Sequence, residues 1–348
     1  MKSKATMNIL LISHLQKGSG NLHTIERIRT YLSDVDYKCT LTSPEEFNDE
    51  GDLKSYVKAN SIKLIIGLHA FRSGKLLQDS KMNYILIIGG TDVNEDYRNQ
   101  EKMTVMTQSV VSSRKIIVFS NGLRQKVQEL WPEMPQNKIF EIKQGVQTCP
   151  SKFSLAGYIH QHHSDVYTTD MSICICVGSI RPVKNPLYLV EEFSKLHERR
   201  QNIIYVICGQ VVDEEYGKLF RTKIDSLPGV IFIPGLPLID AHSAIQQSLA
   251  YINCSNSEGM ALAILEAMML KVPVIVRDID GNKDIVEHGV NGFVFSNPKQ
   301  CIEHVEQLLL DKHLRENTVQ GASEYVQREH SVDSERNKYC DVVQSCME

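Results

Sequence analysis

Short apolar runs alternate along the chain with stretches in which apolar residues recur at helical spacing. The first run, Ile9 to Ile12, lies in a predicted strand over residues 8–13. A helix is predicted over residues 21–32, because its apolar residues fall on one face. Continuous apolar runs are typical of strands that are buried on both faces of a parallel sheet.

The first half of the chain repeats this alternation. Further strands are predicted over residues 62–68, 84–88, 115–119 and 139–142. Helical stretches separate them, such as residues 123–130 and the segment after Asn94. Alternation of strands and helices predicts a parallel sheet covered by helices on both faces.

A second alternating series begins at Ser172. Its predicted strands cover residues 173–177, 203–207, 230–233, 249–253, 272–276 and 293–295. Its predicted helices cover residues 186–197, 214–225, 240–247, 261–270, 283–288 and 298–310, and a final polar helix covers residues 332–346. Ligands of such sheets bind outside the carboxyl ends of the strands.

The sequence therefore predicts an α/β protein with two doubly wound, Rossmann-like domains that face a cleft. We expect the first domain over residues 7–150 and a largely polar linker over residues 151–170. The second domain is expected over residues 171–330, and a closing helix over residues 331–348.

Composition narrows the class of protein. A length of 348 residues favours two domains, and a net charge of −4 argues against a nucleic-acid or membrane-surface partner. No apolar run approaches about 18 residues, so no transmembrane span is expected. The nine scattered cysteines include no Cys-x-x-Cys pair, which favours reduced thiols and a cytoplasmic location. His160, His162 and His163 could chelate a metal, but no carboxylate or Cys ligand stands at a suitable spacing, which favours a solvated linker, so neither a metal nor a cofactor is predicted.

The most informative stretch runs from Ser255 to Met268 and carries Glu258 and Glu266. It follows an apolar strand, begins with small residues and continues as strong helix formers. A helix that opens on small residues offers unpaired N–H groups to a phosphate. Eight helical residues rise about 12 Å, too far for a retaining glycosidase pair at about 5 Å. The two carboxylates suit the ends of one long ligand with an anionic centre, such as a sugar–diphosphate–nucleoside.

Other strand ends of the second domain carry charge or glycine. Arg181 and Lys184 follow the strand over residues 173–177, where they could hold an anion or form an exposed basic turn. Gly235 and Leu238 follow another strand. The glutamate stretch, expected at the same sheet edge, favours the anion site.

The first domain offers weaker signals. Gly18 and Gly20 follow the first strand, but Gly18-x-Gly20-x-x-His23 lacks the third glycine of a dinucleotide fingerprint, so an ordinary turn is at least as plausible as a ligand loop. The strand ends also place four polar residues on the opposing wall of the expected cleft. These residues either form an acceptor or phosphate site, or serve only as helix caps and turn residues. These residues are His69, Arg72, Asp92 and Asn94.

Glu258-x7-Glu266, Gly178-x5-Lys184 and Asp280-Gly281-Asn282 together resemble the motifs of retaining nucleotide-sugar glycosyltransferases of the GT-B fold, family four. The resemblance covers about residues 8–330. It implies a metal-independent enzyme with a nucleotide-diphosphate sugar as co-substrate and an acceptor that the sequence does not identify. It also implies front-face attack, with the leaving phosphate accepting the proton of the acceptor.

The resemblance implies a role for each residue of the donor site. Glu258 would contact sugar hydroxyls and Glu266 the ribose hydroxyls, while Arg181 and Lys184 would neutralise the leaving diphosphate. Backbone N–H groups of the residues after Glu258 would contact the sugar or the diphosphate, and so would the glycine loop after the first strand of the chain. The loop after the third strand of the second domain would influence which base and sugar are bound. The residues concerned are Gly259, Met260, Ala261, Gly18, Gly20, Gly235 and Leu238.

Two positions differ from the family pattern. Ser179 stands where members usually have an arginine, and Gly89 stands where many have a histidine. Arg181 and His69 are the candidates to replace those side chains. A nucleotide-sugar 2-epimerase of the same architecture and a catalytically silent nucleotide-sugar binding protein are the alternative functions. The sequence does not predict an oligomeric state.

Overall fold

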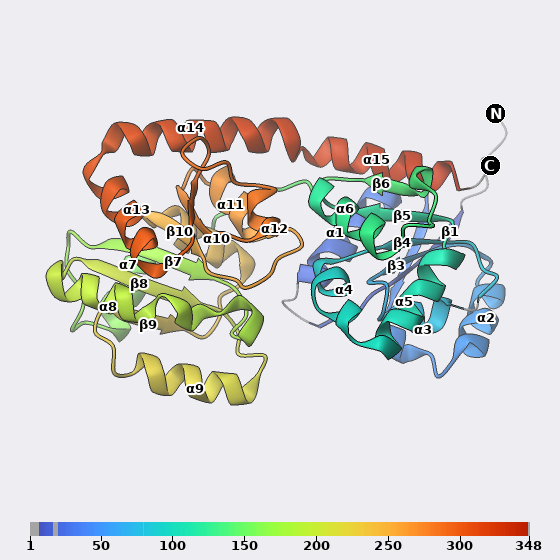
Figure 1. Cartoon of the computed structure of the whole chain (residues 1–348), viewed down its shortest axis with the longest axis horizontal. Coiled ribbons are helices and arrows are strands. Elements are labelled where there is room, and N and C mark those ends of the chain that lie inside the picture. The colour runs from blue at the N-terminus through green and yellow to red at the C-terminus, as the bar shows by residue number, and fades with distance from the viewer. Residues whose placement is uncertain (1–6, 17–19, 79, 347–348) are drawn as a thin grey trace. The chain divides into compact units, whose positions relative to one another are not determined.

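The computed structural model describes residues 7–16, 20–78 and 80–346. It divides into two compact units, each built on one six-stranded sheet (Figure 1). Unit 1 comprises Met1–Gly145 and Val332–Glu348, and unit 2 comprises Val146–Ser331. Every pairing between adjacent strands is parallel.

The sheet of unit 1 has the order β2-β1-β3-β4-β5-β6. Its strands are β1 (Asn8–Ile12), β2 (Lys38–Thr42), β3 (Ile62–Leu68), β4 (Tyr84–Ile87), β5 (Lys115–Val118) and β6 (Ile139–Glu141). Its helices are α1 (Gly20–Ser33), α2 (Glu50–Ala59), α3 (Gly74–Leu77), α4 (Gly90–Asn94), α5 (Gln100–Ser112), α6 (Asn121–Leu130) and α15 (Val332–Gln344).

The sheet of unit 2 has the order β12-β11-β10-β7-β8-β9. Its strands are β7 (Ser172–Val177), β8 (Ile203–Cys208), β9 (Val230–Ile233), β10 (Ala250–Asn253), β11 (Val274–Arg277) and β12 (Phe293–Phe295). Its helices are α7 (Leu155–His162), α8 (Val190–Arg199), α9 (Glu214–Ile224), α10 (Leu238–Gln246), α11 (Leu262–Met269), α12 (Asp280–Lys283), α13 (Pro298–Leu310) and α14 (Lys312–Glu329).

The central strand β8 shows how the sheet of unit 2 is covered. All six of its residues are buried. Ile204 and Val206 pack into one apolar cluster, whereas Tyr205 and Ile207 pack into another. Because alternate side chains of a strand point to opposite faces, both faces of the sheet are covered. The predicted fold class, two doubly wound α/β units with parallel sheets, is confirmed.

Two elements that the hydrophobic pattern did not predict are β2 and α14. The edge strand β2 is mostly half-exposed and polar, so it has no continuous apolar run. Helix α14 buries only Thr318, Ala322 and Val326, a narrow stripe of small residues at four-residue spacing. The helix predicted over residues 283–288 is instead α12, which begins at Asp280.

The stretch over residues 151–170 differs from the predicted linker. It belongs to unit 2 and contains α7, which begins after its N-cap Ser154. Leu155 and Ile159 are fully buried in the core of unit 2. The polar composition of the stretch concealed these two apolar residues, which lie one helical turn apart.

Helix α15 packs on α1 within unit 1, although the two helices lie at opposite ends of the chain. Glu335 of α15 is buried and forms a bidentate pair with Arg27, at 2.9 Å to Nε and 3.0 Å to Nη2. Tyr31 Oη and the backbone N–H of Gly145 donate to the same carboxylate at 2.9 and 2.8 Å. A buried carboxylate needs such partners, so Glu335 fixes α15 to α1.

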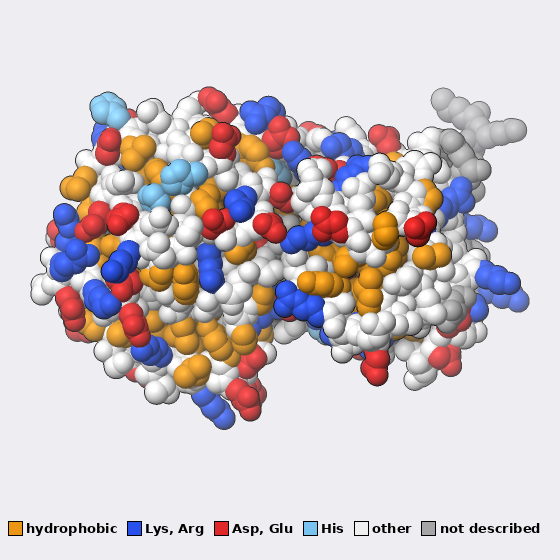
Figure 2. Space-filling view, viewed as in Figure 1, with side chains coloured by type: hydrophobic (Ala, Val, Ile, Leu, Met, Phe, Trp, Pro, Cys, Tyr) orange, Lys and Arg blue, Asp and Glu red, His pale blue; other side chains and the backbone are white. Residues whose placement is uncertain are grey.

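The face of the molecule in Figure 2 carries Lys and Arg side chains interspersed with Asp and Glu, in keeping with the small net charge. Among the helices of the described ranges, none has both the length and the apolar character needed to span a membrane.

We expect Glu335→Gln to destabilise unit 1 by about 3 kcal/mol, because removing one partner of a buried ion pair leaves the other charge uncompensated. Chemical denaturation followed by fluorescence measures the change. The control Asp333→Asn alters an exposed carboxylate of the same helix and should stay within about 0.5 kcal/mol of the parent chain. Equal effects of the two substitutions would contradict the assigned role of Glu335.

Candidate functional site

In the sheet of unit 2, the strand order reverses between the neighbouring strands β7 and β10. The chain leaves β7 towards β8 on one side and leaves β10 towards β11 on the other. Ligands of doubly wound sheets bind at such a switch point, outside the carboxyl ends of the strands. Arg181 and Lys184 lie in the first loop, and Glu258 lies in the second.

Hydrogen bonds join the two loops. The backbone N–H of Asn256 donates to the carbonyl of Val183 at 2.8 Å, and its Nδ2 donates to the carbonyl of Pro182 at 3.2 Å. Asn185 Nδ2 donates to Asn256 Oδ1 at 3.1 Å. Asn185 has a φ of 46°, a left-handed conformation that asparagine tolerates better than most residues. This turn brings Lys184 to the β10 loop.

Lys184 and Glu258 form an ion pair, with Nζ 2.6 Å from Oε1. The side chain of Glu258 is 9% exposed and that of Lys184 is 27% exposed. Ser255 Oγ also donates to Oε1 at 2.6 Å, and Asn253 Nδ2 lies at 3.4 Å. Burial alone would raise the pKa of Glu258, but the charge and hydrogen bond of Lys184 outweigh it. The pKa therefore lies below its ordinary value, and Glu258 is an anion at neutral pH.

Asn282 and Gly281 of α12 complete the surroundings of Glu258. Asn282 is fully buried and donates through Nδ2 to Asn253 Oδ1 at 3.1 Å. A Cβ atom at Gly281 would lie 2.2 Å from the carbonyl oxygen of Glu258, so only glycine permits this approach. Because this carbonyl faces α12, it is not positioned to start a helix.

Helix α11 accordingly begins at Leu262, after the extended residue Ala261. The predicted helix over residues 261–270 is confirmed as α11, but the helical rise assumed from Glu258 to Glu266 is wrong, because the first residues after Glu258 are not helical. Gly259, Met260 and Ala261 lie in the non-helical connection, and Glu266 lies on α11 with 18% of its side chain exposed. Glu266 Oε1 is 3.7 Å from Nε2 of His242, on α10.

Arg181 precedes a short 3-10 helix over Pro182–Lys184. Its Nε is buried and makes no hydrogen bond within the part of the chain that the structure describes. A buried guanidinium N–H that lacks an acceptor suits an anionic ligand.

The loop after β9 lies two strands away from β7 in the sheet. Gly235 has a φ of 102°, which favours glycine, and its N–H donates to the carbonyl of Ile233 at 2.7 Å. Leu238 is exposed at the first position of α10. Because β8 separates their strand from β7, Gly235 and Leu238 form the outlying part of the predicted donor set.

In unit 1, His69 and Asp92 form a buried pair at the carboxyl ends of β3 and β4, with Nδ1 3.1 Å from Oδ2. The N–H groups of Ala70 and Gly89 donate to the same oxygen at 3.0 and 2.9 Å. Burial alone would raise the pKa of Asp92, but the His69 ring and these donors outweigh it, so the pKa lies below its ordinary value. Asp92 is fully buried, so it supports His69 and offers no surface to a ligand.

The pair of His69 and Asp92 also explains why residue 89 is a glycine. A Cβ atom at position 89 would lie 2.6 Å from Cε1 of His69. The imidazole therefore occupies the space that a side chain at position 89 would need. His69 itself has a φ of 75°, a strained left-handed conformation for a residue with a Cβ atom.

The remaining predicted residues of unit 1 are dispersed. Arg72 is exposed in the turn before α3. Asn94 ends α4 and accepts a hydrogen bond from Lys126 Nζ at 2.8 Å. Gly20 is the first residue of α1, and Gly18 lies outside the described residues.

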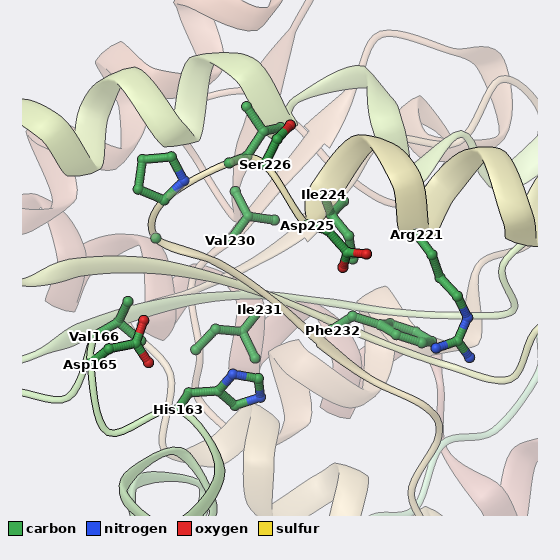
Figure 3. Close-up of a pocket in the computed structure, with 13 residues that line it drawn as sticks. His163, Asp165, Val166, Arg221, Ile224, Asp225, Ser226, Val230, Ile231 and Phe232 are labelled. Carbon is green, nitrogen blue, oxygen red and sulfur yellow. The ribbon is translucent and has the colours of Figure 1, made fainter.

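Unit 2 also contains a cavity of about 580 Å³ that none of the predicted site residues lines (Figure 3). It lies beside the edge strand β9 and the turn that precedes it, at the amino end of the strand. His163 and Asp165 face it after α7, and Arg221 lies over the ring of Phe232 at 5.1 Å. The cavity therefore lies away from the carboxyl edge that carries Lys184 and Glu258.

Among the residues that the structure describes, no three His, Cys, Asp or Glu side chains lie close enough together to hold a metal ion. Sequence reasoning gave no role to the polar residues of the hydrogen-bond network near Glu258, or to the histidine beside Glu266. These residues are Asn253, Ser255, Asn256, Asn282 and His242. The available signal was that four of them stand beside a motif residue, in the stretch 253–258 or in Asp280-Gly281-Asn282.

Comparison with known proteins identifies the family to which the chain is similar. The model of the family described as glycosyl transferases group 1 matches residues 163–325. Glycosyltransferase 1 domain-containing protein 1 of Xenopus tropicalis is 34% identical over 336 residues, which cover 96% of each chain.

Solved structures share the fold at low identity. Alr3699/HepE of Anabaena, in complex with UDP and glucose, matches with a TM-score of 0.78 and 16% identity, over 97% of this chain and 100% of that one. Sucrose-phosphate synthase of Thermosynechococcus elongatus matches with a TM-score of 0.75 and 13% identity, over 98% and 99%. With the family motifs in place and a relative aligned over nearly its full length, the chain belongs to the glycosyl transferases group 1 family and has the GT-B fold.

Proposed function

We propose that this protein is a retaining, metal-independent glycosyltransferase that uses a nucleotide-diphosphate sugar. The observation that carries the proposal is the ion pair of Lys184 and Glu258 at the β7/β10 switch point of unit 2. Arg181 lies in the same loop as Lys184, and its buried Nε has no hydrogen-bond partner among the described residues. Two cations beside an ionised carboxylate suit a diphosphate joined to a polyhydroxylated sugar. The complex of HepE with UDP and glucose supports this class of donor for the fold.

The chemistry places negative charge on the leaving group. When the bond between the anomeric carbon and the diphosphate oxygen breaks, charge develops on that oxygen. Arg181 and Lys184 stabilise this charge, and Lys184 is already held in position by its ion pair with Glu258. The leaving phosphate then accepts the proton of the acceptor hydroxyl, which attacks from the same face. Glu258 holds sugar hydroxyls, and N–H groups of the Gly259–Ala261 connection contact the sugar or the diphosphate.

Glu266 binds the nucleoside end of the donor in this proposal. Its partly exposed carboxylate accepts hydrogen bonds from the ribose hydroxyls. Gly235 and Leu238 lie before or at the start of α10 and influence the choice of base and sugar.

The acceptor residues belong to unit 1. Asp92 accepts from Nδ1 of His69 and holds the ring, and Nε2 is the atom that meets an acceptor hydroxyl in this proposal. Arg72, which is exposed nearby in sequence, is the second acceptor-side residue. Nine free cysteines agree with a reducing compartment, and we place the enzyme in the cytoplasm.

Purified protein incubated with UDP-, GDP- and ADP-sugars in the presence of EDTA should bind one class of donor and release its nucleotide. Binding should also raise the thermal midpoint, because a ligand at 100 times its Kd stabilises the folded state by about 2.7 kcal/mol. The panel is read by nucleotide release and by thermal unfolding. Absence of both signals for every donor would refute the proposal. A changed sugar without an acceptor would identify an epimerase, and binding without turnover a silent binding protein.

Glu258→Gln should lower turnover at least 100-fold, because the amide cannot accept as strongly from sugar hydroxyls or balance Lys184. Nucleoside diphosphate affinity should change much less, since that part of the donor does not contact Glu258. Steady-state kinetics and calorimetry separate the two effects. The control Glu215→Gln alters an exposed carboxylate of the same unit and should leave both unchanged. Unchanged turnover in Glu258→Gln would remove Glu258 from the site.

The ion pair of Glu258 should make unit 2 sensitive to acid. A lowered pKa in the folded state means that the pair stabilises the fold above the ordinary value of 4.5. This contribution is lost as the pH falls through the lower folded-state pKa. The difference in thermal midpoint between the parent chain and Glu258→Gln should therefore be constant above about pH 5.5 and shrink below about pH 4. A difference that does not change with pH would contradict the ionised pair.

A further inference from the structure

His242 is a buried polar residue to which the proposed chemistry gives no role. It lies on α10 and is 2% exposed. Its Nδ1 accepts the backbone N–H of Cys149 at 3.1 Å. Its Nε2 is also buried and makes no hydrogen bond to any residue that the structure describes. A carboxylate oxygen, Oε1 of Glu266, lies 3.7 Å from that nitrogen.

The hydrogen bond from Cys149 determines the tautomer of the ring. Because Nδ1 accepts a hydrogen bond, it carries the lone pair, and the proton of the neutral imidazole is on Nε2. Nε2–H is therefore a neutral donor directed to Glu266, and a buried donor without an acceptor is unfavourable.

Contacts on either side hold the ring in place. Ser151 donates from its N–H to the carbonyl of Ile239 at 3.1 Å and from Oγ to Asp240 Oδ1 at 2.5 Å. Ser243 Oγ donates to the carbonyl of Ser151 at 2.9 Å. The segment that contains Cys149 is thereby attached to α10 immediately before and after His242. Turning the imidazole away from Glu266 would break its own hydrogen bond with Cys149.

We infer that His242 is the positioning residue for Glu266 and thereby a determinant of ribose recognition. A shift of about 0.8 Å in the Glu266 side chain brings its Oε1 to hydrogen-bond distance from Nε2. One carboxylate oxygen is then held by His242, and the group is oriented to accept from the 2′ and 3′ hydroxyls. The inference rests on the proposed function, in which Glu266 binds the ribose.

The consequence is selectivity for ribonucleotides. A site built to accept hydrogen bonds from substrate hydroxyls rejects the analogue that lacks them, because its own polar groups lose their partners. An unheld carboxylate is free to turn to solvent, so the hydroxyls contribute less. His242 should therefore affect the affinity for a ribonucleoside diphosphate more than that for its 2′,3′-dideoxy form.

Two substitutions separate positioning from mere packing. His242→Gln keeps an amide N–H near the place of Nε2, whereas His242→Asn keeps an acceptor near the place of Nδ1 and loses the donor to Glu266. Calorimetry measures the Kd of UDP, GDP or ADP, whichever binds the parent chain most tightly, and of its 2′,3′-dideoxy form. Circular dichroism checks the fold of each variant. Should the Asn variant not fold, His242→Phe serves as the variant without a donor.

We expect His242→Asn to weaken the ribonucleotide about tenfold, the lower end for losing a hydrogen bond to a charged group, and the dideoxynucleotide less than about twofold. His242→Gln should retain most of the preference. Glu266→Ala should lose the preference, and adding His242→Asn to it should have no further effect.

Unchanged preference in His242→Asn, or equal loss in the Asn and Gln variants, would overturn the inference while leaving the proposed function intact. Failure of the parent chain to bind any of the three nucleoside diphosphates would overturn the proposed function and the inference with it.

Discussion

The carboxylate of Glu258 is the constraint on which the candidate site depends. An ionised carboxylate is stable in a buried position only with a cation and hydrogen-bond donors around it. The cation comes from the loop after β7, and the donors come from the end of β10 and the turn that follows it. Neutralising one charge therefore requires two separate loops to meet. The left-handed turn at Asn185 and the bonds of Asn256 follow from that requirement.

Much of the fold could be predicted from the sequence, because strands buried on both faces leave continuous apolar runs. The run from Ile9 to Ile12 in β1 and the whole of β8 are examples. Such a pattern carries no information on the order of strands in a sheet, so the reversal between β7 and β10 could not be read from it. Elements with little apolar surface, such as β2 and α14, were missed because they leave no such run.

The candidate site was only partly predictable. Motif spacing brought attention to Lys184 and Glu258, but as residues with separate tasks. Their ion pair depends on a loop conformation that hydrogen bonds between distant segments determine. His242 gave no sequence signal, because one histidine among apolar residues has the same pattern whether it packs in a core or orients a neighbour. Asp92 shows the opposite case, since a polar residue at a strand end proved to be buried support for His69.

The bond between Glu335 and Arg27 bears on the order in which the protein forms during synthesis. Unit 2 is one continuous stretch, so it can fold as soon as Ser331 has left the ribosome. Unit 1 begins earlier in the chain but lacks α15, and with it the anion for Arg27, until unit 2 has been made. The half that is translated first is thus completed last. Until then the surface of α1 that α15 later covers stays uncovered.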